Sequence, residues 1–203
     1  TRRSSDLETG LSSDPSMNRR LSALDSFHLI SNSDAHSPAK LGREANLFDI
    51  PMSYDGLYGA IQRGEGLAGT IEFFPEEGKY HFDGHRKCHL CLSPSQARQY
   101  NGICPVCGKK LTTGVLHRIE QLADRQEDFI LPGGRPYENL VPLPEVIAAC
   151  MGSSSASVKV TRQYEHMLEE LGNEFHILRS AGLDDISRIG GQLTAQGIRH
   201  LRE

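Results

Sequence analysis

Four of the five cysteines form two closely spaced pairs. Two residues separate Cys88 from Cys91 and Cys104 from Cys107, and twelve residues lie between the pairs. Two thiolates on a tight turn can bind one cation, and two such turns supply the tetrahedral set of four sulfur ligands that zinc accepts. Because all four coordination positions are then filled, we expect a structural zinc ion that folds a small domain and does no chemistry.

Disulfide bonds and redox chemistry are the alternative roles for these cysteines. Disulfides are disfavoured in a chain that we expect to be intracellular, and a redox motif needs one cysteine pair in a thioredoxin-like unit rather than two matched pairs. His81, His85 and His89 crowd the first pair, and we interpret them as surface residues or as groups outside the coordination sphere. Cys150 is interpreted as a small buried hydrophobic residue.

A polar loop at residues 33–38, which contains Asp34 and His36, is the second chemical feature. The loop directly follows a short hydrophobic segment at 27–30 that predicts a buried strand. In β/α proteins the loop beyond the carboxyl end of a strand forms the active face, and a carboxylate and an imidazole two residues apart there are suitable metal ligands. Two ligands do not complete a metal site, and capping of the next helix is the alternative role for such polar residues.

Strands and helices alternate around this loop. The segment 69–74, like 27–30, is predicted to be a strand, whereas 42–48 and 53–63 are predicted to be helical. This alternation predicts an α/β fold for the first part of the chain. Beyond Pro144, apolar residues at helical spacing predict a helical tail.

Turn-forming residues divide the chain into three parts. Proline and glycine residues cluster at 75–78 and again at 131–136. We therefore predict a first domain at residues 1–76, a zinc-ribbon domain at 77–128 and a small helical domain at 129–203.

The composition limits the class of protein. The chain has 203 residues, of which 37% are hydrophobic, so it is long enough and apolar enough to bury a core. It has no Trp and only 6% aromatic residues, which argues against single-strand binding platforms built from many rings. The sequence contains neither an apolar run of membrane-spanning length nor a secretory signal, so we expect a cytoplasmic protein without membrane contact.

The charge is distributed unevenly along the chain. The net charge is −4, yet residues 79–125 hold eight basic and three acidic residues, a surplus of five positive charges. A basic module within an acidic chain is suited to a polyanion, with a solvated basic face as the alternative. The candidate DNA-binding residues are Arg86, Lys87, Lys109 and Lys110.

Two glycine motifs suggest alternative phosphate sites. Gly64, Gly66 and Gly69 have the spacing of a dinucleotide fingerprint, but they follow a predicted helix and precede a predicted strand, the reverse of the order that this motif needs. The segment 186–198 is similar to a helix-hairpin-helix, whose glycine turn can offer amide groups to a phosphate. Plain helix packing is the alternative interpretation of that segment.

Several segments together resemble one family of phosphoesterases. The polar loop and its surroundings are similar to the last metal motif of the PHP (polymerase and histidinol phosphatase) phosphoesterases, in the form found in the endonuclease Q family. The similarity covers nearly the whole chain, including the cysteine-rich region and the helical tail. The segments that carry it outside that region and tail are 8–15, 27–38, 41–46 and 71–81.

This resemblance implies a fold, a site and an activity. The first domain is then the C-terminal part of a PHP-type β/α barrel, Asp34 and His36 are ligands of its phosphoesterase metal centre, which holds zinc, manganese or magnesium, and the four cysteines hold the family's zinc domain. The implied activity is that of a metal-dependent DNA repair endonuclease, which nicks DNA on the 5′ side of deaminated bases such as uracil or hypoxanthine and of abasic sites. DNA that contains such bases is the implied partner.

One part of the family pattern has no counterpart upstream of Asp34. PHP centres take most of their ligands from earlier motifs that begin with a His-x-His pair, whereas His28 stands alone here. We therefore expect the C-terminal half of a longer protein, which needs the N-terminal half of the PHP domain as its partner and is inactive on its own. Two other functions stay open: a zinc-ribbon module that binds nucleic acid without catalysis, and a PHP phosphatase that acts on a small metabolite.

Overall fold

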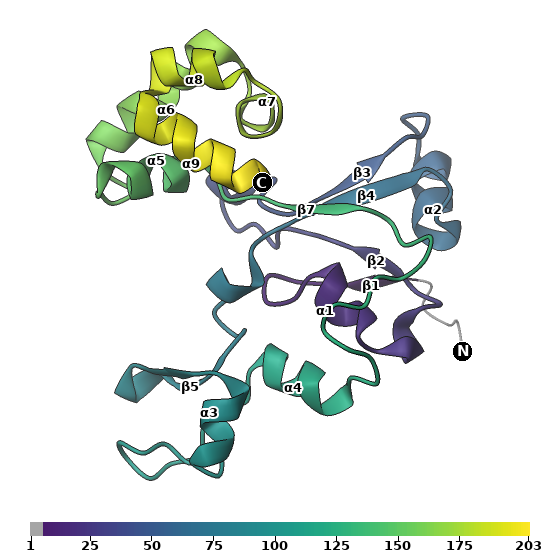
Figure 1. Cartoon of the computed structure of the whole chain (residues 1–203). Coiled ribbons are helices and arrows are strands. Elements are labelled where there is room, and N and C mark those ends of the chain that lie inside the picture. The colour runs from purple at the N-terminus through teal and green to yellow at the C-terminus, as the bar shows by residue number, and fades with distance from the viewer. Residues whose placement is uncertain (1–5) are drawn as a thin grey trace. The chain divides into compact units, whose positions relative to one another are not determined.

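The chain packs into two compact units. The computed structural model describes residues 6–203, so the first five residues of the predicted domain 1–76 lie outside it. The first unit ends at Glu138, and the second runs from Asn139 to Glu203 (Figure 1). The predicted division into three domains stays a prediction.

Two small sheets form the framework of the first unit. β1 (Asp6–Glu8) and β2 (His28–Ile30) run parallel, so their carboxyl ends lie at the same edge. In the other sheet, β4 (Leu67–Glu72) lies between β3 (Ala45–Phe48) and β7 (Tyr137–Asn139), and it is antiparallel to β3. β4 is buried at five of its six positions, which makes it the central strand of the core.

Two predicted strands and one predicted helix of this unit are confirmed, and one predicted helix is wrong. β2 and β4 correspond to the predicted strands, and α2 (Tyr54–Arg63) corresponds to the helix predicted at 53–63. Residues 42–48, in contrast, contain strand β3, in which Ala45 pairs with Ile71 of β4. Pairing with a buried neighbouring strand outweighs the local helix propensity of this segment.

Local sequence determines where the helices of the first unit begin and end. The Ser53 hydroxyl caps the start of α2, and Gly64 ends this helix with a left-handed φ of +73°. The glycine motif that starts at Gly64 thus leads from a helix into a strand, as predicted. The Asp14 carboxylate caps α1 (Pro15–Arg19). The short 3-10 helices of residues 6–138 are η1 (Ser22–Leu24), η2 (Pro38–Lys40), η3 (Pro75–Glu77) and η4 (Arg86–Cys88).

Residues 83–122 form a small substructure of the first unit, here called the cysteine module. β5 and β6 form an antiparallel hairpin, and Gly84 of β5 also pairs with Thr112. The elements of the module are β5 (Asp83–His85), β6 (Leu90–Leu92), α3 (Pro94–Gln99) and α4 (Val115–Leu122). Its hydrophobic core is small and consists of Leu92, Ala97, Cys104 and Leu111.

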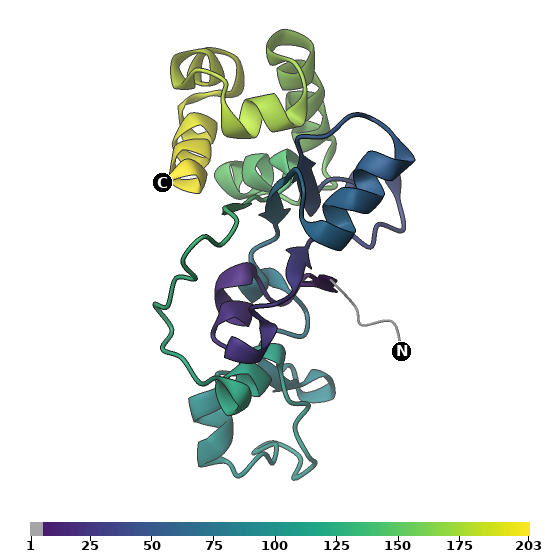
Figure 2. The same ribbon diagram turned by 90° about the vertical axis from the view of Figure 1, so that its right-hand side faces the viewer.

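The second unit is a bundle of five helices, which confirms the predicted helical tail (Figures 1 and 2). α5 packs against α6 and α9, and α6 also packs against α7 and α8. The helices are α5 (Leu143–Met151), α6 (Val158–Leu171), α7 (Glu174–Arg179), α8 (Leu183–Gly190) and α9 (Gln192–Arg202). The fully buried side chains of the core come from all five helices: Leu143, Ile147, Val160, Met167, Ile177, Ile186 and Ile198.

The turn between α8 and α9 contains two glycines with different roles. Gly190 is buried against Met167, because a Cβ atom at this position would lie 2.9 Å from Met167 Sδ. Gly191 has a φ of +87°, and nothing lies within 4 Å of its ideal Cβ position. The turn therefore allows close helix packing on one side and leaves its backbone open on the other.

No helix within residues 6–203 has both the length and the apolar character that a membrane span requires.

Candidate functional site

The loop after β2 carries Asp34 and His36 on the surface of the first unit. Both residues are exposed, and the Nδ1 atom of His36 lies 2.8 Å from the Asp34 carbonyl oxygen. A hydrogen bond from Nδ1 leaves the Nε2 atom of His36 available as a ligand. Asp34 has a left-handed φ of +44°, a conformation that costs energy for a residue other than glycine and that clusters at functional sites.

Side chains from the neighbouring strands and loop hold the backbone that leads into this loop. Asn46 of β3 accepts a hydrogen bond from the Ser31 amide (3.0 Å) and donates one to the Ser31 carbonyl (2.7 Å). Arg43 donates two hydrogen bonds to the Ser33 carbonyl. The Ser31 hydroxyl donates to the Ile71 carbonyl of β4 (2.9 Å). Hydrogen bonds to β3 and β4 therefore hold the backbone from which the loop starts.

A fully buried carboxyl group, Glu72, lies at the end of β4. Its oxygens accept hydrogen bonds from the hydroxyl groups of Thr9 and Thr70. Burial raises the pKa of Glu72 to about 7, although these hydrogen bonds act in the opposite direction. Sequence reasoning missed this residue, because a single acidic residue at the end of a strand forms no motif.

Glu44, directly before β3, is a second buried carboxyl group. Only 3% of its surface is exposed, and a hydrogen bond with the backbone of Phe73 acts to lower its pKa. Burial, followed by the charge of Glu72, raises the pKa of Glu44 to about 7. The two carboxyl groups are therefore close enough for the charge of Glu72 to affect Glu44.

The role of Asp34 and His36 as metal ligands stays a prediction. No further histidine, cysteine or acidic residue within residues 6–203 joins them in a group of three or more ligand atoms close enough to hold one ion. A catalytic zinc site commonly has three protein ligands, so a metal at this loop needs ligands from elsewhere.

The cysteine module contains a compact group of four ligand atoms. His85, Cys88, Cys104 and Cys107 each place one such atom within 4.8 Å of the others. The Nδ1 atom of His85 is 3.1 Å from Cys88 Sγ and 3.4 Å from Cys107 Sγ. Three thiolates and one imidazole form a common ligand set for structural zinc, so these donors fit that ion. This cluster can therefore bind a structural zinc ion.

Three of the four predicted cysteines belong to this group, and Cys91 lies outside it. Cys91 is exposed in the middle of β6, between Leu90 and the buried Leu92. Successive side chains of a strand point to opposite faces, so a strand that directs Leu92 into the core directs Cys91 away from it. His85, which the sequence led us to place outside the coordination sphere, occupies the fourth position of the group instead. The His-x-x-Cys spacing of His85 and Cys88 was the available signal.

The surroundings of the thiols shift their pKa values in opposite directions. Burial, together with the neighbouring thiols of Cys107 and Cys104, raises the pKa of Cys88 to about 11. Burial also acts to raise the pKa of Cys104, but hydrogen bonds from the amides of Cys107 and Val106 outweigh it and lower this pKa. Because zinc binds thiolates, a zinc ion at this cluster would have to displace a tightly held proton at Cys88.

A buried hydrogen bond between Asp83 and His117 joins β5 to α4 within the cysteine module. Asp83 is 2% exposed, and its carboxylate accepts a hydrogen bond from the Gly114 amide at 2.5 Å. The other carboxylate oxygen lies 2.5 Å from Nδ1 of His117. Asp83 thus fixes the start of α4 relative to the hairpin that carries His85.

The four predicted DNA-binding residues lie on the surface of the cysteine module. All four are exposed, and none of them forms an ion pair within residues 6–203. Arg98 differs from them, because it pairs with Glu120 at 2.9 Å. The unpaired residues are Arg86, Lys87, Lys109 and Lys110.

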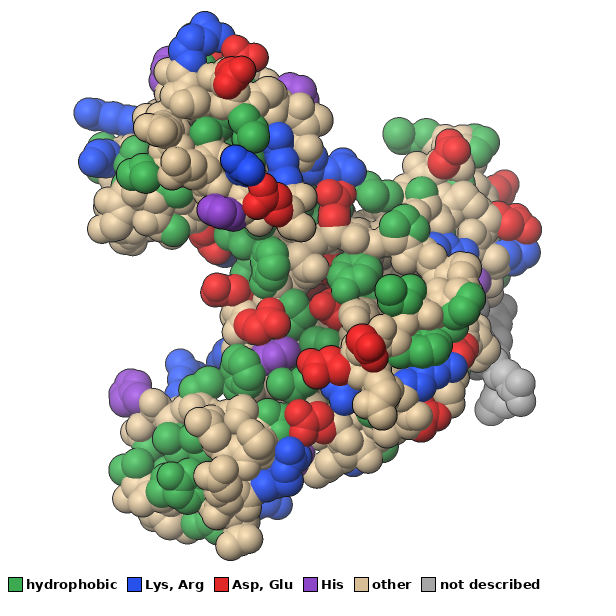
Figure 3. All heavy atoms as spheres, in the orientation of Figure 1, with side chains coloured by type: hydrophobic (Ala, Val, Ile, Leu, Met, Phe, Trp, Pro, Cys, Tyr) green, Lys and Arg blue, Asp and Glu red, His purple; other side chains and the backbone are tan. Residues whose placement is uncertain are grey.

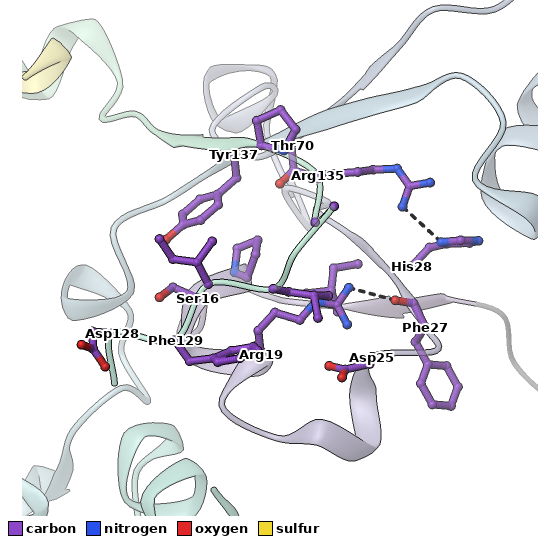
Figure 4. A pocket seen from close by; sticks show the side chains of 17 residues that line it. Ser16, Arg19, Asp25, Phe27, His28, Thr70, Asp128, Phe129, Arg135 and Tyr137 are labelled. Atoms are coloured by element: carbon purple, nitrogen blue, oxygen red, sulfur yellow. Dashed lines mark hydrogen bonds between the residues drawn. The ribbon is translucent and has the colours of Figure 1, made fainter. Parts of the chain in front are cut away.

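A pocket of about 740 Å³ lies in the first unit between the segments 15–29 and 128–137 (Figure 4). Arg135 donates hydrogen bonds to two backbone carbonyls and to Nδ1 of His28. Arg19 donates to the Phe27 carbonyl at 3.0 Å. Burial, followed by the charge of Arg135, lowers the pKa of His28. These cationic side chains hold the walls of the pocket in place.

Comparison with known proteins finds a family that matches the second unit and two uncharacterized relatives that match most of the chain. Residues 142–203 match the family described as the MJ0043 C-terminal domain. The chain is 34% identical over 192 residues to the uncharacterized protein MJ0043 of Methanocaldococcus jannaschii, covering 90% of this chain and 24% of that protein. It is 28% identical over 193 residues to the uncharacterized protein YqxK of Bacillus subtilis, covering 93% of this chain and 46% of that protein.

Two solved structures are similar over nearly the whole chain. The lesion-specific endonuclease PfuEndoQ from Pyrococcus furiosus matches with a TM-score of 0.83 and 31% identity, over 97% of this chain and 50% of that one. A complex of endonuclease Q with a 27-mer duplex, which has an abasic lesion at the active site, matches with a TM-score of 0.84 and 31% identity, over 96% of this chain and 50% of that one. The chain is therefore related to endonuclease Q and spans half the length of these structures and less than half of the curated relatives.

Proposed function

We propose that this chain is part of a metal-dependent DNA repair endonuclease, which nicks DNA on the 5′ side of deaminated bases such as uracil or hypoxanthine and of abasic sites. The observation that carries this proposal is the similarity to two endonuclease Q structures, one of them a complex with lesion-containing duplex DNA. The exposed, unpaired cations of the cysteine module support a polyanionic substrate.

In this proposal the Asp34 loop contributes part of the catalytic metal centre. The Asp34 carboxylate and the Nε2 atom of His36 would hold a zinc, manganese or magnesium ion together with ligands from the N-terminal half of the PHP domain. Such an ion supplies Lewis-acid stabilisation of the charge that develops on the scissile phosphate. Arg43 and Asn46 fix the backbone before the loop, so they orient both ligands.

The cysteine module contributes structure and substrate binding in this proposal. His85, Cys88, Cys104 and Cys107 would hold a zinc ion with no open coordination position, so the ion stabilises the fold and takes no part in cleavage. The exposed cations Arg86, Lys87, Lys109 and Lys110 would contact phosphate groups of the DNA.

A second candidate function is a DNA-binding module without catalysis. It is favoured by one observation: within residues 6–203, neither Asp34 nor His36 belongs to a group of three or more ligand atoms. We therefore expect the 203-residue chain alone to bind DNA weakly and to cleave none, whereas the full-length protein nicks it.

A nicking assay on uracil-containing duplex tests the proposal. In the full-length protein, Asp34→Ala and His36→Ala are expected to abolish nicking and to leave the cysteine module folded, because the loop and the cysteine cluster are separate groups. Asp55→Ala, which changes an exposed aspartate of α2, is the matched control and is expected to nick as the wild type does. Full nicking by either loop variant would remove the loop from the catalytic centre.

A further inference from the structure

The turn between Cys104 and Cys107 presents apolar side chains to solvent. Val106 is 68% exposed and Ile103 is 42% exposed, and Pro105 between them is exposed as well. Figure 3 shows hydrophobic side chains gathered on the surface of the cysteine module. An exposed apolar group of this kind commonly marks a contact surface. We refer to Ile103, Pro105 and Val106 as the apolar tip.

Backbone hydrogen bonds make the apolar tip rigid. The Cys104 amide donates to the Lys109 carbonyl at 2.7 Å, and the Gly108 amide donates to the Cys104 carbonyl at 2.9 Å. The Leu111 amide donates to the Gly102 carbonyl at 2.8 Å. Cys104 is also buried in the core of the module. A rigid tip loses little conformational entropy when it makes a contact, so its apolar surface is available for binding.

Cations adjoin both parts of the ligand cluster that supports the tip. Lys109 and Lys110 follow Cys107 closely in sequence, and Arg86 and Lys87 directly precede Cys88. Each of these four cations lies within three residues of a member of the ligand cluster. Because consecutive Cα atoms are only about 3.8 Å apart, all four cations lie near the tip. Residues 84–119 contain six Lys or Arg residues and no Asp or Glu. The charge around the tip therefore fits a polyanion and repels a basic partner.

We propose that the apolar tip is a wedge that the cysteine module places against an opened base step of duplex DNA. This inference rests on the proposed function, in which the surrounding cations bind the phosphate backbone. Intact duplex DNA keeps the apolar faces of its bases stacked, whereas a step beside an abasic or unpaired nucleotide exposes them. Proteins that kink or open DNA use side chains such as Ile, Leu and Pro in this way. The tip then recognises a distorted base step, whereas the cations supply binding affinity that does not depend on the distortion of the DNA.

Binding of the 203-residue chain to two labelled duplexes tests this inference by fluorescence anisotropy. One duplex contains a single abasic site, and the other is intact and otherwise identical. We expect the wild type to favour the abasic duplex, and the double variant Ile103→Ser and Val106→Ser to lose about fivefold or more of this preference, because serine removes the apolar surface that contacts the opened step. The affinity of this variant for the intact duplex should change less than twofold.

Two control variants separate the tip from the cations and from general surface effects. Val158→Ser changes a valine of α6 that is also 68% exposed, and it should leave both affinities unchanged. Lys109→Gln with Lys110→Gln should weaken binding to both duplexes equally and reduce the salt dependence of binding. Zinc content and circular dichroism establish that each variant is folded.

The possible outcomes distinguish this inference from the proposed function. Unchanged preference in the tip variant, or an equal loss on both duplexes, overturns the wedge and leaves DNA binding standing. No binding to either duplex by the wild type overturns the proposed DNA contact and the wedge with it. Concentration-dependent dimerisation that the tip variant abolishes assigns the tip to self-association and also overturns the wedge.

Discussion

At the scale of single residues, the fourth ligand of the cysteine cluster shows the limit of motif spacing. The spacing of the cysteines predicted a set of four sulfurs, and three of them do meet. The spacing does not reveal that Cys91 falls within β6, where strand alternation turns its side chain away from the core. Only the position of the β5–β6 hairpin shows whether Cys91 or His85 lies close to the other three ligand atoms.

We predict that Cys91→Ser binds one zinc ion per chain with an affinity within about twofold of the wild type. His85→Ala should lower zinc affinity by at least about 100-fold, because it removes a ligand rather than an exposed thiol. Competition with a chromogenic chelator measures both affinities. A loss of affinity in Cys91→Ser as large as that in His85→Ala would contradict the ligand set of the cluster.

The buried carboxyl group of Glu44 makes stability depend on pH. Its pKa is about 7 in the folded chain and about 4.5 in the unfolded chain. The folded state therefore holds a proton that the unfolded state has lost between these values, so the contribution of Glu44 to stability is greatest below pH 4.5 and falls as the pH rises to about 7. Burial raises the pKa of Glu72 as well, so its carboxyl group acts on stability in the same direction.

Glu44→Gln should therefore be more stable than the wild type at pH 8 by about 1–3 kcal/mol, because the amide cannot ionise. At pH 4.5 the two proteins should have nearly the same free energy of unfolding. Urea unfolding at both pH values, followed by circular dichroism in the presence of zinc, measures the difference. The same difference at both pH values would show that ionisation of Glu44 is not its cause.

At the scale of elements, strands and helices with strong local signals were predictable and β3 was not. α2 has a serine cap and a glycine stop, and α6 has apolar residues at helical spacing, so local sequence suffices for both. Residues 42–48 contain good helix formers, yet their hydrogen bonds go to β4. Asn46 of this strand also holds the loop before Asp34, so the error concealed a residue that positions the candidate site.

The buried pair of Asp83 and His117 connects two elements of the cysteine module. Asp83→Ala should lower the free energy of unfolding by about 2–4 kcal/mol, because it leaves the Gly114 amide and His117 without their buried partner. Urea unfolding measures the change, and Asp55→Ala serves as the exposed control. A loss below about 0.5 kcal/mol, the usual limit for surface substitutions, would show that the pair does not stabilise the module.

At the scale of the whole molecule, the helical unit and the cysteine module, which is one part of the first unit, differ in the size of their cores. The helical unit has buried side chains from all five of its helices, whereas the cysteine module has a core of four small or medium residues. A core of that size offsets little of the entropy of ordering the chain, so we expect the module to depend on a bound zinc ion. The cysteine spacing predicts this dependence, and the division of the chain into three domains likewise stays a prediction.

Removal of zinc by a strong chelator should unfold the cysteine module and leave the helical unit intact. Hydrogen exchange followed by mass spectrometry should show rapid exchange in residues 83–112 and unchanged protection in residues 143–202. Re-addition of zinc restores the protection. Equal loss of protection in both segments would mean that the two units unfold as one.

The carboxylate-free segment 84–119 also affects how copies of this protein meet in solution. With six positive charges there and a net charge of −4, the rest of the chain carries a net charge of −10. Each molecule therefore presents oppositely charged regions, and the cationic region of one copy attracts the acidic surface of another when few ions screen them. The protein should consequently show salting-in: its solubility is lowest in dilute buffer and rises as salt is added.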